Sequence, residues 1–203
     1  MPGELGCWLY YMAPEQNAFW IAGLGILSYN LKAKLPDLQD VSASIADPFV
    51  NTRRHGRQVG GQDLHDYVPL YWATHTPMQY VVTHKRLLPQ DDLAFFVLNA
   101  VRVLALPGVW STDGNAASSE TAFYEGAGAL PFLDWQILAT PNCWSYAYKR
   151  KKCAEVLVPN RIGPELIRRV VVHSEATCRE LREQMTRIGR PTPVIEVDPS
   201  LYY

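Results

Sequence analysis

The chain has 203 residues, of which 48% are hydrophobic and 19% are charged, and its formal net charge is −1. This composition is typical of a folded protein and excludes a disordered chain, which would be poorer in apolar residues. The length predicts a single domain over residues 1–203. Because the net charge is close to zero, any surface that binds nucleic acid must be a local basic patch.

The sequence shows no signal peptide and no apolar run long enough to span a membrane, so we expect a cytoplasmic protein with no membrane partner. Its four cysteines form no C-x-x-C pair and have no histidine at zinc-type spacing: Cys7, Cys143, Cys153 and Cys178. We therefore expect no metal site and interpret the cysteines as small hydrophobic residues in a reducing compartment.

In chain order, the first expected elements are a strand at residues 7–12 and a helix that opens at Pro14 and stops at Gly23 to Gly25. Residues 32–61 predict a long loop that contains a short helix and ends in Gly60-Gly61. Six apolar runs then predict strands: residues 67–72, 80–83, 95–106, 156–158, 170–172 and 194–197. The pattern predicts an α+β fold with a sheet core.

Residues 132–138 predict a helix, and residues 139–152 predict a further loop. The clearest helix follows Ser174, a candidate N-cap, and Gly189 is expected to end it. Apolar residues recur on one helical face between them: Cys178, Leu181, Met185 and Ile188.

Glu155 is the residue of greatest chemical interest, because it begins an apolar strand directly after a basic run. A carboxylate costs free energy to bury, so such a residue lies at an edge, is paired, or has a function. Pairing with a neighbouring lysine is the simpler explanation, and this segment alone favours it.

Two other polar segments are weaker candidates. Residues 112–118 read TDGNAAS, a small turn in which Asp113 or Asn115 would contact a ligand, although an ordinary polar turn is the simpler interpretation. His65 and Asp66 would form a general-base pair, but adjacent residues of an extended segment point in opposite directions. The sequence contains no P-loop, no nucleophile elbow and no dinucleotide fingerprint.

Five segments in order carry a more specific signal: residues 64–71 (LHDYVPLY), 76–78 (TPM), 112–117 (TDGNAA) with Phe123-Tyr124, 149–158 (KRKKCAEVLV), and Tyr202-Tyr203. Together they resemble the DarT family of DNA ADP-ribosyltransferase toxins. The resemblance implies an ADP-ribosyltransferase fold, a split β-sheet with flanking helices that holds NAD⁺ in its cleft.

The resemblance also implies roles for individual residues. Glu155 matches the family's catalytic glutamate, and Arg54 matches a catalytic arginine that also contacts the cofactor. Further cofactor contacts are expected from Tyr11, Asn17, Tyr67 and Tyr71. Nucleic-acid contacts are expected from Met78, Lys149, Arg150, Lys151 and Lys152.

The implied activity is transfer of ADP-ribose from NAD⁺ to a base of single-stranded DNA, with release of nicotinamide, by a toxin that has a cognate antitoxin able to reverse the modification. Tyr11 stands where the family has a histidine, and His75 stands where an arginine is common. These departures slightly favour guanine over thymine as the modified base. The alternatives are the same fold acting on RNA or protein, and a catalytically silent nucleic-acid-binding module.

Overall fold

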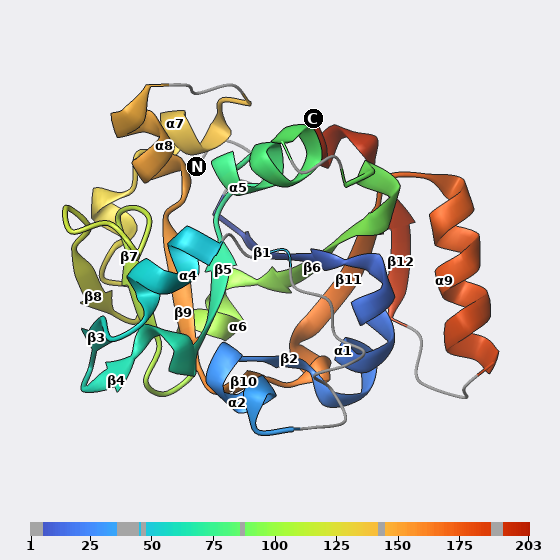
Figure 1. The fold of residues 1–203 in the computed structure, drawn as a ribbon, viewed down its shortest axis with the longest axis horizontal. Helices are drawn as coiled ribbons and strands as arrows, with labels where there is room; N and C mark the ends of the chain where they lie inside the picture. Colours follow the sequence, from blue (N-terminus) through green and yellow to red (C-terminus); the bar gives the residue numbers. More distant parts are fainter. Residues whose placement is uncertain (1–5, 36–44, 46–47, 86–87, 142–144, 188–192) are drawn as a thin grey trace.

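The computed structural model describes residues 6–35, 45, 48–85, 88–141, 145–187 and 193–203. Within these ranges the core is an eight-stranded sheet in the order β12-β11-β6-β1-β5-β9-β7-β8 (Figure 1). Its strands are β1 (Trp8–Pro14), β5 (Tyr67–Tyr71), β6 (Leu93–Asn99), β7 (Trp110–Thr112), β8 (Phe123–Glu125), β9 (Glu155–Pro159), β11 (Ile167–Val172) and β12 (Val194–Val197). The pair β11–β12 is parallel and the other pairs are antiparallel.

Helices and small ribbons surround this sheet, which confirms the predicted α+β class. The helices are α1 (Ala18–Leu24), α2 (Tyr29–Ala33), α4 (Pro48–Arg54), α5 (Pro77–Tyr80), α6 (Ala100–Leu104), α7 (Trp135–Ala139), α8 (Tyr146–Lys152) and α9 (Glu175–Arg187). Two ribbons pair β2 (Ile26–Leu27) with β10 (Arg161–Ile162) and β3 (Gln58–Val59) with β4 (Gln62–Asp63). No helix in the described ranges is both long enough and apolar enough to cross a membrane.

The sheet divides into two halves between β1 and β5. Strand β1 pairs with β6 along its whole length, from Trp8 to Pro14, but meets β5 only at the pair Tyr10–Tyr71. The halves β12-β11-β6-β1 and β5-β9-β7-β8 therefore diverge from a narrow junction. This is the split sheet that the sequence predicts, and the divergence leaves room for a cavity.

The predicted C-terminal helix is confirmed as α9. The Ser174 hydroxyl accepts a hydrogen bond from the Thr177 amide at 3.3 Å and caps the helix. Cys178, Leu181 and Met185 are buried against the sheet, as their spacing predicts. The remaining residues of that prediction, Ile188 and Gly189, lie outside the described residues, as does Cys143.

Two sequence predictions of secondary structure were wrong. Residues 80–83 form the end of α5 and the start of a π-helical turn, η3 (Val81–Lys85), instead of a strand. Thr76 caps α5 and Pro77 occupies its first turn, and this start signal outweighs the β-propensity of two valines. The apolar run 95–106 is a strand only as far as Asn99, whose side chain caps α6 through the Arg102 amide.

Two predicted loops also contain regular structure. Helix α4 is the short helix expected within residues 32–61. The β3–β4 hairpin begins in that range and ends at Asp63, and Gly60 and Gly61 form its turn with positive φ angles of 56° and 79°. Helix α8 occupies the second half of the predicted loop 139–152, where Ser145 caps it through the Tyr148 amide.

Candidate active site

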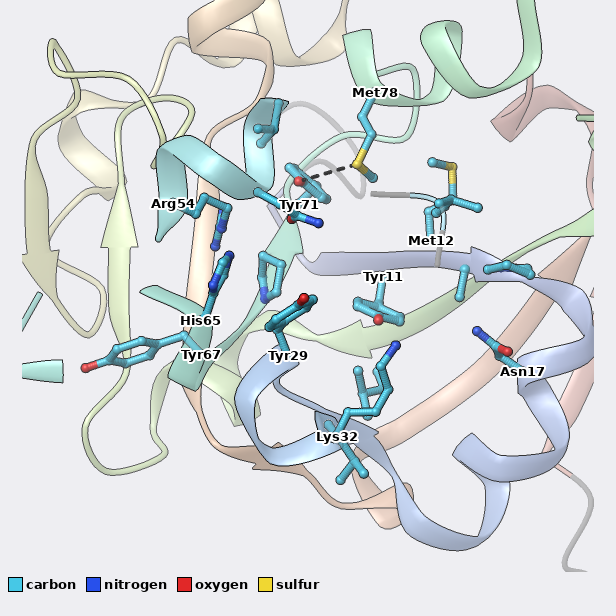
Figure 2. Close-up of a pocket in the computed structure, with 18 of the residues that line it drawn as sticks. Tyr11, Met12, Asn17, Tyr29, Lys32, Arg54, His65, Tyr67, Tyr71 and Met78 are labelled. Atoms are coloured by element: carbon cyan, nitrogen blue, oxygen red, sulfur yellow. Dashed lines mark hydrogen bonds between the residues drawn. The ribbon is translucent and has the colours of Figure 1, made fainter. Parts of the chain in front are cut away.

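A cavity of about 370 Å³ opens beside the junction of the two half-sheets, between β1, β5, α1, α2, α4 and α5 (Figure 2). Its volume lies in the range of roughly 300–1,000 Å³ that is typical of small-molecule sites. The structure brings together the five residues predicted to contact the cofactor, all of which line this cavity: Tyr11, Asn17, Arg54, Tyr67 and Tyr71. Met78, predicted to contact nucleic acid, lines it as well.

The alternation of β5 explains why two of these tyrosines face the cavity. Side chains of successive strand residues point to opposite faces. Tyr67, Pro69 and Tyr71 line the cavity, whereas Val68 and Leu70 are buried in the main core. The Tyr67 hydroxyl donates a hydrogen bond to the Val59 carbonyl at 3.1 Å, so this side chain also fixes the β3–β4 hairpin.

Glu155 lies directly across the ladder from Tyr71, at the start of β9. Its carboxylate forms a buried ion pair with Arg54, with Arg54 Nη1 2.8 Å from Glu155 Oε2. Glu155 is 1% exposed and Arg54 is 6% exposed, and Arg54 lines the cavity. Two residues separated by 101 positions in the sequence are thus brought into one charged pair at the cavity wall.

The protonation of Arg54 follows from this pair. Burial lowers the pKa of Arg54, but the Glu155 carboxylate, together with Tyr71 and Asp63, raises it, and the net shift is upward. The guanidinium therefore stays charged. Its Nη2 atom is buried and has no hydrogen-bond partner, so one donor of the fork is left for a ligand.

The turn 112–118 fixes the other carboxylate oxygen of Glu155. The Ala116 amide donates a hydrogen bond to Glu155 Oε1 at 2.9 Å. The Thr112 hydroxyl accepts from the Glu155 amide at 2.9 Å, which ties β7 to the start of β9. Asn115 lines the cavity, and its side-chain oxygen accepts from the Ala117 amide. The predicted ligand turn thus orients the carboxylate through its backbone.

Arg150, at the centre of the basic run, braces this turn. Its Nη1 atom lies 3.2 Å from Asp113 Oδ1, and its carbonyl accepts from the Asn115 amide at 2.9 Å. A Cβ atom at Gly114 would lie 2.5 Å from Arg150 Nη1, so a larger residue here would displace the arginine side chain from the turn. Arg150 therefore stabilises the turn whose Ala116 amide binds the Glu155 carboxylate. The sequence predicted only a contact between Arg150 and nucleic acid.

Lys152, predicted to contact nucleic acid, serves the fold in this structure. Its side chain is buried, and its ammonium donates to three carbonyls at the end of α7, those of Ile137, Leu138 and Thr140, at 2.6–3.2 Å. A lysine in this position satisfies the last carbonyls of a helix. This burial corrects the expectation that Lys152 meets a phosphate.

Replacing Lys152 with methionine is expected to lower the free energy of unfolding by about 3 kcal/mol, because three buried carbonyls lose a charged donor. The matched control is Lys149→Met, which changes an exposed residue of the same helix and should have little effect. Urea denaturation of both variants measures the difference. Equal stability of the two variants would contradict the assignment of Lys152 as a helix cap.

Burial also fixes the protonation of the aromatic wall and of the nearby thiol. It raises the pKa of Tyr11 to about 12, and with the Glu155 carboxylate it raises that of Tyr71 well above its usual range. Both are neutral phenols, and Tyr71 Oη lies 3.8 Å from the sulfur of Met78 (Figure 2). Burial raises the pKa of Cys153 to about 12, which rules out a reactive thiolate beside Glu155.

Several cavity residues with polar side chains were not assigned to the site from the sequence, among them Tyr29, Lys32 and His65. Lys32 and Tyr29 lie on the short helix α2, whose few residues carry no motif. His65 was weighed only as a partner of Asp66, and that carboxylate accepts instead from Asn30 at 2.9 Å. In the described part of the chain, no group of three His, Cys, Asp or Glu side chains is placed to hold a metal ion.

A split sheet whose cleft carries a buried arginine–glutamate pair defines an enzyme of the ADP-ribosyltransferase class. The chain belongs to the DarT family, because the family model described as "ssDNA thymidine ADP-ribosyltransferase, DarT" matches residues 10–203.

Individual relatives agree with this family. The chain is 29% identical over 168 residues to a DNA ADP-ribosyl transferase of Thermus sp. (strain 2.9), a match that covers 76% of this chain and 79% of that protein. It is 27% identical over 198 residues to a DNA ADP-ribosyl transferase-DNA ADP-ribosyl glycohydrolase fusion protein of Thermosipho africanus (strain H17ap60334). That match covers 96% of this chain but 49% of the fusion protein, so the chain spans about half of the fusion's length.

Solved structures show the same fold. Thermus sp. 2.9 DarT in complex with ADP-ribosylated ssDNA matches with a TM-score of 0.85 and 25% identity, covering 98% of this chain and 97% of the other. Thermus sp. 2.9 DarT in complex with NAD+ matches with a TM-score of 0.81 and 24% identity over 98% of each chain. These likenesses confirm the predicted ADP-ribosyltransferase fold.

Proposed function

We propose that residues 1–203 form one domain that transfers ADP-ribose from NAD⁺ to a base of single-stranded DNA and releases nicotinamide. The observation that carries this proposal is the buried ion pair between Glu155 and Arg54, which lines the cavity of about 370 Å³. Solved relatives of this fold hold NAD⁺ or ADP-ribosylated single-stranded DNA, which supports the same co-substrate and target here.

The residues present fit a dinucleotide. Tyr11, Tyr67 and Tyr71 offer aromatic walls for the nicotinamide and adenine rings, and Asn17 offers an amide. Arg54 Nη2 is a buried donor without a partner inside the protein, and a charged donor in that state is costly unless a ligand uses it. These are the features of a site that is completed by its substrate.

Glu155 is assigned two tasks in the reaction. As the bond between nicotinamide and ribose breaks, nicotinamide leaves with the bonding electron pair and positive charge develops on the sugar, as in glycoside hydrolysis. The carboxylate stabilises this charge and holds the ribose 2′-hydroxyl. A nitrogen of the base then bonds to the sugar carbon, and Glu155 accepts the proton that this nitrogen loses.

In this structure Arg54 lines the cavity, whereas Glu155 is 1% exposed. Glu155 Oε2 accepts from Arg54 and Oε1 accepts from the Ala116 amide, and each carboxylate oxygen has a further lone pair. The Arg54 side chain therefore has to move aside for the ribose hydroxyl to reach the carboxylate. Arg54 then binds the reacting substrate by charge-assisted hydrogen bonds, a task suited to a guanidinium.

The DNA-binding surface is proposed to include helix α8, which lies beside α7 at one edge of the molecule (Figure 1), and Met78 at the cavity. Tyr146 is 72% exposed and Tyr148 is 49% exposed, and exposed aromatic rings stack on unpaired bases. Lys149 and Lys151 are assigned to phosphates, although Lys151 also contacts Asp134 at 2.9 Å. Arg150 contributes through the turn that it braces.

Guanine is proposed as the modified base, with thymine as the alternative. The family model's description names thymidine. In this chain Tyr11 replaces a family histidine and His75 replaces a common arginine, and His75 Nε2 lies 2.8 Å from the Tyr202 carbonyl. The side chain at position 75 is thus tied to the C-terminal segment, so it offers the base neither the charge nor the reach of an arginine.

Labelled NAD⁺ incubated with separate DNA, RNA and protein pools tests the substrate class. The proposal expects label on single-stranded DNA, with weaker labelling of duplex because its bases must first be unstacked. Label confined to RNA or protein would establish the alternative substrates, and an absence of both transfer and nicotinamide release would establish a silent binding module. Mass spectrometry of labelled oligonucleotides that contain one guanine or one thymine identifies the base.

A partner that removes the modification is part of the proposal. The Thermosipho africanus relative carries a DNA ADP-ribosyl glycohydrolase in the same polypeptide, which supports a toxin–antitoxin arrangement. Expression of this chain alone and with a candidate glycohydrolase tests it: growth arrest is expected from the first and rescue from the second.

A further inference from the structure

The charged side chains that line the cavity are basic. In the parts of the chain that the structure describes, its lining includes Lys32, Arg53, Arg54 and His65, but no aspartate or glutamate side chain. Burial lowers the pKa of Lys32, and among the described residues no carboxylate opposes that shift. A half-buried ammonium without an acid partner is costly unless it meets an anion. The cavity is therefore built for a ligand with negative charge.

His65 is the second unsatisfied group. It is 6% exposed, and within the described residues neither of its ring nitrogens has a hydrogen-bond partner; Asp63 Oδ1 lies 3.9 Å from Nδ1, beyond hydrogen-bond distance. The ring packs against Tyr29, with centroids 4.6 Å apart, and Figure 2 shows it directly beside Arg54. Burial lowers the pKa of His65; Asp63 and Asp66 oppose the shift, and Arg54 and His55 add to it. The ring is thus a neutral imidazole with one N–H to donate.

Lys32 approaches the same space from α2. Tyr29 and Lys32 are three residues apart on that helix and so share one face. Figure 2 shows both side chains directed into the cavity, with Lys32 toward Tyr11 and Tyr29 toward His65. The helix therefore presents a cation on one side of the cavity, and Arg54 with His65 presents unpaired N–H donors on the other.

We infer that Lys32 and His65 hold the diphosphate of the dinucleotide, Lys32 as its charge partner and His65 as a neutral donor beside Arg54. A diphosphate supplies the two things that these side chains lack, negative charge and acceptor oxygens. This inference rests on the proposed use of NAD⁺, and it assigns positioning residues that the sequence motifs do not mark.

The test compares ligands with and without phosphate. Binding of NAD⁺, ADP and adenosine to wild type, Lys32→Met and His65→Phe is measured by calorimetry. Each substitution is expected to weaken NAD⁺ and ADP by about tenfold or more and to leave adenosine unchanged. The controls are Lys34→Met and His84→Phe, which alter exposed residues outside the cavity and should bind all three ligands normally.

Thermal stability provides a second readout. Since both ring nitrogens of His65 are unpaired, His65→Phe keeps the packing on Tyr29 and should leave Tm unchanged or raise it, whereas a structural histidine would lower Tm. NAD⁺ binding by wild type with unaltered affinity in both variants would overturn this inference alone. No NAD⁺ binding by wild type would overturn the proposed function as well.

Discussion

Replacing Glu155 with glutamine is expected to reduce the rate of ADP-ribose transfer by roughly 10²–10⁴-fold, the range for the loss of a positioned base and of charge stabilisation. Glutamine keeps the shape of the side chain and the acceptor for the Ala116 amide, which lies 2.9 Å from Glu155 Oε1. It removes the negative charge that the developing cation and the departing proton both need. NAD⁺ binding should survive, because most of the cavity wall is unchanged.

Single-turnover transfer from labelled NAD⁺ to a single-stranded oligonucleotide measures this effect, with NAD⁺ affinity determined in parallel. The control is Glu125→Gln, which changes an exposed carboxylate on β8 and should transfer at the normal rate. Loss of NAD⁺ binding together with transfer would mean that Glu155 holds the cofactor and leaves the chemistry to another group.

Replacing Arg54 with methionine is expected to lower the free energy of unfolding by about 3–5 kcal/mol, because the Glu155 carboxylate, 1% exposed, then lies buried without its cation. Such a loss is a large share of the roughly 5–15 kcal/mol that stabilises a typical domain. Adding Glu155→Gln to Arg54→Met should restore much of the stability, since both buried charges are then gone. Activity should stay absent in both variants.

Urea denaturation of wild type, the two single variants and the double variant gives the coupling between the residues directly. The expected coupling is strong, with the double variant more stable than Arg54→Met. Additive losses would show that the two side chains do not act as a pair in solution, contrary to their 2.8 Å contact.

The sheet and the proposed catalytic pair, Glu155 and Arg54, were predicted from different features of the sequence. The strands and helix α9 were predicted from the spacing of apolar residues, because the face of an element that is buried in the core must be apolar. Glu155 and Arg54 do not stand out locally, since a glutamate beside lysines has a simpler explanation. Both residues were predicted from the resemblance of several segments, in order along the chain, to the DarT family. In the structure, Glu155 begins β9 beside β5, and Arg54 ends helix α4.

What sequence could not predict depends on contacts between distant residues. Helix α8 has no regularly spaced apolar residues, so the sequence predicted a loop here, with residues 149–152 all expected to contact nucleic acid. In the structure Lys152 caps α7 and Arg150 braces the turn under Glu155, which separates two supporting residues from the exposed Lys149. The contact between Asp66 and Asn30, in place of a His65–Asp66 pair, likewise follows from no spacing rule.

We propose that Glu155 catalyses the transfer of ADP-ribose from NAD⁺ to a base of single-stranded DNA. Intact-mass analysis of a defined single-stranded oligonucleotide, after incubation with NAD⁺ and either wild type or Glu155→Gln, tests it most directly. We expect one added ADP-ribosyl group per modified oligonucleotide with wild type and an unmodified mass with the variant. An oligonucleotide left unmodified by wild type, or modified equally well by the variant, would contradict it.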